Sequence, residues 1–229
     1  MRYLVLCSDY DGTLARHGEL LNRTTAAIER LRSSGRRVVL VTGRELDDLQ
    51  SVCPRLDLFE YVVAENGALL YQPSSATIEL LAPKPPARFV EMLKARGVER
   101  ISSGRVIVAT WEPFETIVLE TIRDLGLELQ VIFNKGAVMV LPSGVSKATG
   151  LAVVLERMKI PASSAVGVGD AENDHALLAY CGCAVAVSNA LQSLKDEADV
   201  VTRGSHGDGV IEVIESLIAT DTCGALGED

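Results

Sequence analysis

Residues 4–20 of the chain read LVLCSDYDGTLARHGEL, and this stretch gives the first indication of the fold class. Its first four residues are apolar, and Asp9 and Asp11 follow with one residue between them. A short aliphatic run of this kind is typical of a strand buried on both faces. Alternate residues of an extended chain point to the same side, so we expect both carboxylates at one place beyond the strand. Two buried carboxylates repel each other, which predicts a cationic partner there.

The pattern of a short aliphatic run followed by a helical segment recurs along the chain. Residues 22–34 carry apolar side chains at helical spacing and stop at Gly35, and a second aliphatic run follows directly. The expected strands lie in residues 3–8, 36–44, 164–170, 183–190 and 198–204, and residues 61–71 are expected to form a short strand, a turn at Asn66-Gly67 and a return strand. Strands that alternate with helices predict an α/β fold with a doubly wound, Rossmann-like parallel sheet.

A segment of different character interrupts this alternation. Pro83, Pro85 and Pro86 cannot continue a central strand or a helix interior and therefore predict a hinge. Beyond them we expect a helix at 87–96, a strand at 100–111, a helix at 112–126 and two strands around residues 134–136. We therefore predict an α/β core formed by residues 1–82 and 143–229, with a small α+β cap at 83–142.

The composition excludes several classes of function. The chain has 22 Lys and Arg against 31 Asp and Glu, a formal net charge of −9, which argues against nucleic acid and membrane surfaces as partners. We expect a cytoplasmic protein, a monomer or a homodimer, that binds a small soluble ligand.

The five cysteines show no metal-binding spacing, and we expect them to be buried thiols in a reducing compartment. The last residues, 219–229, are expected to be frayed.

Four polar stations stand at the ends of the predicted core strands or at the start of a core helix. They are Asp9-x-Asp11-Gly12-Thr13, Thr42-Gly43-Arg44, Lys147, and Gly169-Asp170-x-x-Asn173-Asp174. The carboxyl ends of parallel strands gather at one crevice, so we expect these stations to meet. Four clustered carboxylates need a hard cation, and Mg²⁺ suits an all-oxygen site that also holds phosphate. A hydroxyl, a lysine and backbone N–H groups are suitable contacts for that phosphate.

These four stations, in order and spacing, resemble the motifs of the haloacid dehalogenase superfamily. The run Asp9-Tyr10-Asp11-Gly12-Thr13 is similar to its DxDGT signature, and the resemblance extends over essentially the whole chain. The turn at Asn66-Gly67 and the place of the insertion resemble the subgroup with a C2-type cap, above all its IIB branch. That branch includes Cof-type sugar phosphatases, sucrose-phosphate phosphatase and archaeal-type phosphoglycolate phosphatase, and the short cap is most similar to the last of these.

The resemblance implies a role for each residue of the stations. Asp9 would attack phosphorus and form an aspartyl-phosphate, while Asp11 would protonate the leaving group and later activate water. The implied Mg²⁺ ligands are Asp9, the Asp11 carbonyl group, Asp170 and Asp174, the last directly or through water. The implied substrate-binding residues are Thr42, Gly43, Arg44, Asn66, Lys147 and Asn173.

Several alternatives stay open on the sequence alone. A phosphotransferase or phosphomutase would use the same residues, and a domain that senses a phosphorylated metabolite without turnover would need fewer of them. Arg44 could instead pair with Glu45 or Asp48. Arg105 and Lys135 are expected as ordinary exposed cap charges, with a part in substrate specificity as the alternative. Phosphoglycolate and a sugar phosphate are the two leading substrates.

Overall fold

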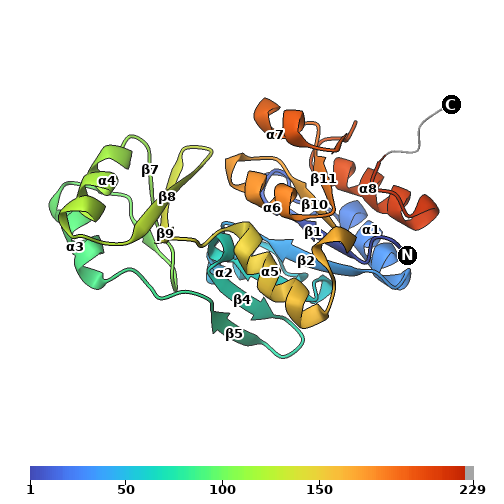
Figure 1. Ribbon diagram of the computed structural model, residues 1–229, viewed down its shortest axis with the longest axis horizontal. Helices are drawn as coiled ribbons and strands as arrows, with labels where there is room; N and C mark the ends of the chain where they lie inside the picture. The colour runs from blue at the N-terminus through green and yellow to red at the C-terminus, as the bar shows by residue number, and fades with distance from the viewer. Residues whose placement is uncertain (225–229) are drawn as a thin grey trace.

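The computed structural model describes residues 1–224, which form one sheet of eight strands and a second sheet of four (Figure 1). In spatial order the core sheet consists of β12 (Val200–Val201), β11 (Cys183–Ala186), β10 (Ala165–Gly169), β1 (Val5–Ser8), β2 (Arg37–Val41), β3 (Tyr61–Ala64), β4 (Leu69–Gln72) and β5 (Thr77–Leu80). All pairs from β12 to β3 are parallel, and β4 and β5 are antiparallel additions at one edge. The predicted α/β fold with a parallel sheet is confirmed.

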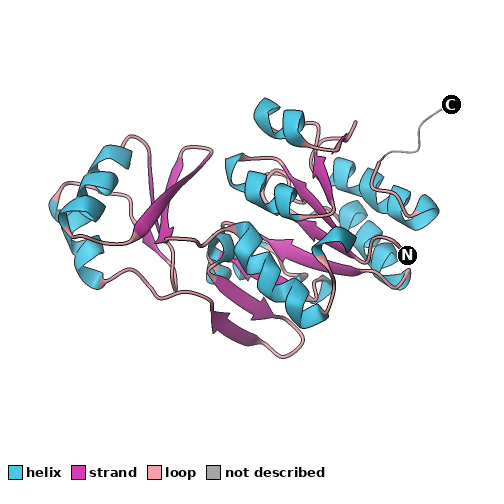
Figure 2. Cartoon of the chain, in the orientation of Figure 1, coloured by secondary structure: helices cyan, strands magenta, loops and turns pink. Residues whose placement is uncertain are grey.

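Helices cover both faces of the core sheet (Figure 2). They are α1 (Asn22–Ser33), α2 (Leu46–Val52), α5 (Lys147–Met158), α6 (His175–Tyr180), α7 (Gln192–Glu197) and α8 (Gly207–Thr220). The chain moves from β1 to β2 in one direction and from β10 to β11 in the other, so right-handed crossovers place α1 and α6 on opposite faces. α1 packs against α8, and α5 packs against α6. The strand β1 lies between these layers and is fully buried.

The edge strand β5 and the helix α7 were not predicted. Residues 77–80 read TIEL, and an alternation of only four residues is too short to identify a strand; in the structure all four are exposed. The helix α7 is only six residues long and buries one apolar side chain, Leu194, which is too short a pattern to read from sequence.

The cap is the part of the chain between β5 and α5, and it lies to the side of the core in Figure 1. It contains α3 (Ala87–Ala95), α4 (Glu115–Asp124) and a sheet in the order β6 (Ser102–Ser103), β7 (Val108–Trp111), β9 (Ala137–Pro142) and β8 (Leu129–Asn134). The expected strand at 100–111 is two short strands, because residues 104–107 leave the cap sheet to contact the core. The sequence-based cap boundaries fall before α3 and at the end of β9.

The two faces of the cap sheet serve different purposes. Val138 and Val140 of β9 pack with α3 and α4 in the small core of the cap. Met139 and Leu141, which alternate with them, pack instead with Ala68 of the core. The alternation of a strand therefore gives the cap one face for its own stability and one face turned to the core.

Two cysteines depart from the expectation of free thiols. The left-handed conformation of Asp221 ends α8 and turns the chain back, which brings Cys223 to Cys183 of β11, and the two form a disulfide with a Cα–Cα distance of 6.6 Å. Their separation of 40 residues gave no signal in the sequence. The expectation of fraying is also wrong up to residue 224, because α8 extends to Thr220 and Asp221 accepts a hydrogen bond from the N–H of Tyr3. Residues 225–229 lie outside the described part of the chain.

The helices also show whether a segment of the chain could span a membrane. In residues 1–224, no helix combines the length and the apolar character needed to cross a membrane.

The disulfide predicts a measurable loss of stability on reduction. In the chain-entropy model, a closed loop of this length contributes about 4 kcal/mol to the free energy of unfolding. Urea unfolding with and without reductant should show a loss of that order, and Cys223→Ser should match the reduced protein. Thiol titration of the unfolded, unreduced protein should find the three remaining cysteines, Cys7, Cys53 and Cys181. Five reactive thiols before reduction would contradict the pairing.

Candidate active site

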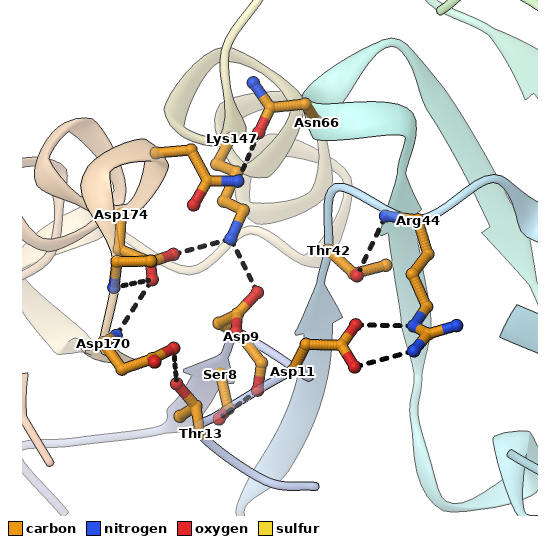
Figure 3. Close-up of polar contacts among 12 residues, drawn as sticks. Ser8, Asp9, Asp11, Thr13, Thr42, Arg44, Asn66, Lys147, Asp170 and Asp174 are labelled. Atoms are coloured by element: carbon orange, nitrogen blue, oxygen red, sulfur yellow. Dashed lines mark hydrogen bonds and ion pairs between the residues drawn. The ribbon is translucent and has the colours of Figure 1, made fainter. Parts of the chain in front are cut away.

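The predicted stations meet at the carboxyl edge of the core sheet (Figure 3). β1 lies between β2 and β10, and Ser8 at its end pairs with Leu40 and Val168. The residues that follow these three strands therefore emerge side by side, and the N–H of Asp9 donates to the carbonyl oxygen of Val168 (2.9 Å). Parallel pairing thus brings together segments that are far apart in sequence.

Lys147 is the centre of a buried cluster of charges. It is the first residue of α5, whose start is fixed by a capping box between Ser146 and Thr149. Its Nζ donates to Oδ1 of Asp9 and to Oδ1 of Asp174, each at 2.6 Å, and its side chain is 1% exposed. Burial acts to lower the pKa of Lys147, but the two aspartates outweigh it and raise the pKa above its usual value. Lys147 is therefore a permanent cation.

In Asp9 the effect of burial prevails, so the charged form is disfavoured. Burial raises its pKa from 3.8 to about 7, and although Lys147 opposes this rise, the nearby Asp174 and Asp170 add to it. Burial likewise raises the pKa of Asp170, whose Oδ1 accepts a hydrogen bond from the hydroxyl of Thr13 (2.9 Å). Both carboxylates would therefore be stabilised in their charged form by additional positive charge.

The donor set fits a hard divalent cation. Asp9, Asp170 and Asp174 are buried, and each offers a carboxylate oxygen within 4.8 Å of the others. The carbonyl oxygen of Asp11 lies at the same place, because one lysine nitrogen contacts both it and Asp170. Four oxygen donors and no nitrogen or sulfur among them suit Mg²⁺ better than a transition metal.

Asp174 is already engaged through both of its oxygens. Oδ1 accepts from Lys147, and Oδ2 accepts from the N–H groups of Asp170 (2.9 Å) and Ala171 (3.0 Å). The turn after β10 wraps so closely around this carboxylate that a Cβ at Gly169 would lie 2.6 Å from the Cβ of Asp174. Asp174 therefore holds both Lys147 and the loop that carries Asp170.

Asp11 points away from this cluster, toward Arg44 (Figure 3). Its two carboxylate oxygens accept from Nε (2.5 Å) and Nη2 (2.8 Å) of Arg44, in a bidentate pair. Arg44 also contacts Asp48, one of the two partners considered from sequence. The N–H of Arg44 donates to Oγ1 of Thr42 (3.1 Å), which leaves the hydroxyl hydrogen of Thr42 for a ligand oxygen.

Asn66 and Asn173 contact each other at the back of the site. Nδ2 of Asn173 donates to Oδ1 of Asn66 (3.0 Å). In the part of the chain that the structure describes, Oδ1 of Asn173 is buried without a hydrogen-bond partner. Both Asn173 and Gly43 line the cavity between the core and the cap. An orphaned acceptor here is suited to a donor on a ligand.

Glu65 is a residue of the site that the sequence analysis missed. Its side chain is buried, and its carboxylate accepts from the backbone N–H groups of Arg105 (2.8 Å), Val106 (2.6 Å) and Ile107 (2.8 Å). Glu65 and Asn66 both have a positive φ, near 50° and 56°, so the turn sends one side chain to the cap and the other to the core loop. The turn at Asn66-Gly67 was recognised in the sequence. The role of Glu65 was not, because the cap segment that it binds offers backbone N–H groups and carries no side-chain motif.

A cavity of about 340 Å³ lies between the core stations and the cap. The core contributes Asp9, Asp11, Thr42, Gly43, Arg44, Glu45, Asp48, Ala171 and Asn173. The cap contributes Ser102, Ile107, Ala109, Thr110, Trp111, Asn134, Ala137 and Met139. The cap covers these core residues with a face that is largely apolar and has a few polar groups.

The two cap charges left open by the sequence differ in their contacts. Arg105 forms a surface pair with Asp47 of α2 (2.9 Å). Lys135 reaches into the core, where its Nζ contacts Oδ2 of Asp170 (2.7 Å) and the carbonyl oxygen of Asp11 (3.1 Å). The expectation of an ordinary exposed charge is therefore wrong for Lys135.

The fold and the site define an α/β enzyme core with a cap over a buried carboxylate cluster, and comparison with known proteins identifies it. The family model described as haloacid dehalogenase-like hydrolase matches residues 6–108 and 106–214. The chain therefore belongs to the haloacid dehalogenase-like hydrolase family.

The chain is similar to phosphoglycolate phosphatases. The chain is 31% identical over 221 residues to a phosphoglycolate phosphatase of Natronomonas pharaonis, covering 92% of this chain and 96% of the relative. It is 31% identical over 226 residues to a phosphoglycolate phosphatase of Pyrobaculum aerophilum, covering 96% and 97%. The prediction of a phosphatase of this family is confirmed.

Solved structures show the same fold. A haloacid dehalogenase-like hydrolase from Bacteroides thetaiotaomicron superposes with a TM-score of 0.79 at 21% identity, covering 94% of this chain and 99% of the other. A subclass IIB sugar phosphatase superposes with a TM-score of 0.74 at 17% identity, covering 93% and 97%.

Removal of Lys147 should destabilise the metal-free protein in a pH-dependent manner. Lys147→Met leaves buried carboxylates without their cation, which costs about 3 kcal/mol. The pKa of Asp9 in the folded protein, already above its ordinary 3.8, then rises further. A carboxyl group whose pKa is higher in the folded than in the unfolded protein supports folding most at low pH and less as the pH rises. The loss in the free energy of unfolding caused by Lys147→Met should therefore be larger at pH 8 than at pH 5.

Urea unfolding in EDTA measures this deficit. The matched control is Lys94→Met, on the exposed face of α3, which should change the free energy of unfolding by less than about 0.5 kcal/mol. An equal deficit at both pH values would contradict the assignment of Lys147 as the compensating charge.

Proposed function

We propose that the protein is a Mg²⁺-dependent phosphatase that hydrolyses a small phosphorylated metabolite, with phosphoglycolate as the first substrate to test and a sugar phosphate as the second. One observation carries this proposal. Asp9, Asp170 and Asp174 converge in a buried cluster whose charge Lys147 offsets in part, and Asp9 of this cluster lines the cap-covered cavity. The names of the relatives support the choice of phosphoglycolate.

The proposed ion ligands are the carboxylates of Asp9 and Asp170 and the carbonyl group of Asp11. Asp174 acts through water in this proposal, because its oxygens already hold Lys147 and the turn after β10. The ion supplies charge neutralisation and orients the phosphoryl group when it is bound.

Asp9 is the proposed nucleophile. Lys147 fixes its carboxylate and offers a buried positive charge to the phosphoryl oxygens, so an anionic substrate can approach an anionic nucleophile. The hydroxyl of Thr42, the backbone of Gly43 and the side chain of Asn173 face the same cavity as further phosphate contacts. Attack of an Asp9 oxygen on phosphorus forms an aspartyl-phosphate as the bond to the leaving alkoxide breaks.

Asp11 is the proposed acid and base. It gives a proton to the leaving alkoxide and then takes one from the water that hydrolyses the aspartyl-phosphate. In the structure Arg44 holds Asp11 toward the rim of the cavity, so Asp11 must leave that pair to act. An anionic group of the substrate bound by Arg44 would release it. Closure of the cap excludes bulk water during both steps.

Replacement of the nucleophile tests the proposal directly. Asp9→Asn should release no phosphate from an aryl phosphate above the background rate, while the wild type should do so only with Mg²⁺ present. Asp196→Asn, on the exposed surface of α7, is the control and should keep the wild-type rate. Turnover by Asp9→Asn, or wild-type turnover in EDTA, would refute the assignment. A panel of phosphorylated metabolites then ranks phosphoglycolate against sugar phosphates.

Replacement of Asp11 separates catalysis from binding. Asp11→Asn should lower kcat by two or more decades, the usual contribution of an acid–base group, and should still bind inorganic phosphate. Steady-state kinetics and phosphate titration measure the two effects. A near-wild-type kcat would exclude Asp11 as the acid. Phosphate found on an acceptor sugar would favour a phosphotransferase, and tight binding without turnover would favour a sensor.

A further inference from the structure

The turn between β8 and β9 carries a cap lysine into the core site. Lys135 stands at the tip of this turn with a positive φ of 49°, followed by Gly136 at 82°. Its Nζ lies 2.7 Å from Oδ2 of Asp170 and 3.1 Å from the carbonyl oxygen of Asp11. Its backbone N–H also donates to Oε2 of Glu172 (3.3 Å). The turn is therefore docked on the loop that follows β10.

The oxygens that Lys135 contacts are two of those proposed to bind the divalent cation. Mg²⁺ binds oxygen at about 2.0–2.1 Å and prefers strict octahedral geometry. An ammonium group hydrogen-bonded to the same two oxygens would occupy the space of the ion, and the two positive charges would repel each other strongly at such a distance. The ion and the Lys135 contact therefore exclude each other.

The cap has a second contact with the core that does not involve these oxygens. Glu65 holds the cap segment 105–107 through three backbone N–H groups, with its carboxylate fully buried. Lys135, in contrast, is 46% exposed and has a long, flexible side chain, so it can leave Asp170 without opening the rest of the interface. The contact at Glu65 can therefore persist while Lys135 exchanges its partners.

We propose that Lys135 is a cap-borne competitor for the divalent cation, so that docking of the β8–β9 turn and binding of the ion oppose each other. Entry of the ion releases the ammonium group from Asp170 into the cavity, where it becomes available to an anionic part of the substrate. The inference rests on the proposed function only for the position of the ion.

The test is the affinity for Mg²⁺ alone, measured by calorimetry on EDTA-stripped protein without substrate. Lys135→Met should bind Mg²⁺ about fivefold more tightly than the wild type, the scale expected for loss of one partly exposed ion pair. Lys135→Arg keeps the positive charge and should stay near the wild-type affinity. Lys94→Met, an exposed lysine elsewhere in the cap, is the matched control and should leave the affinity unchanged.

Hydrogen exchange gives a second readout that does not depend on activity. Adding Mg²⁺ to the wild type should lower the protection of the Lys135 amide, whose bond to Glu172 depends on docking of the turn. In Lys135→Met that amide should be little protected with or without Mg²⁺, whereas the amides of 105–107 should stay protected throughout.

Two results would overturn the inference. One is a Mg²⁺ affinity of Lys135→Met equal to or weaker than that of the Lys94→Met control, with the thermal unfolding of both variants matching the wild type. The other is the absence of Mg²⁺ binding in all variants. Failure of the proposed function is distinguishable, because the competition would then be present while the wild type released no phosphate from an aryl phosphate.

Discussion

The arrangement of the site follows from one electrostatic constraint, the placement of several carboxylates in a volume from which water is largely excluded. Asp9, Asp170 and Asp174 would each be costly to bury alone, and Lys147 offsets only part of their combined charge. The adjacent parallel strands β1 and β10 force the first two together, and the start of α5 supplies the lysine. The negative charge that remains is the charge that the proposed divalent cation would offset.

The polar stations of the core could be predicted from sequence because their positions follow from strand geometry. A buried aliphatic run ends at a defined residue, and parallel pairing then brings such ends together regardless of their separation in the chain. Asp9, Thr42 and Asp170 are found where this reasoning expects them, at the ends of three neighbouring strands. Lys147 was predicted as a phosphate ligand, and the structure shows that it also holds two buried aspartates together.

The contacts between cap and core could not be predicted, because they depend on tertiary structure without a local signal. Glu65 binds backbone N–H groups, which every cap sequence offers, and Lys135 is one charge among many until the β8–β9 turn places it. The pair of Asp11 and Arg44 likewise depends on how the loops after β1 and β2 approach each other. The disulfide between Cys183 and Cys223 depends on the path of the chain after α8.

The attachment of the cap through Glu65 has a consequence for how such an enzyme can diversify. The glutamate recognises only main-chain amides, so its hydrogen bonds do not depend on which side chains residues 105–107 carry. Val106 and Ile107 are buried in the apolar cluster between cap and core, so the packing there still requires apolar side chains. Ile107 is both part of this attachment and a wall of the cavity. Replacement of Ile107 by another apolar side chain would thus reshape the cavity while the hydrogen bonds of Glu65 to the backbone stay in place.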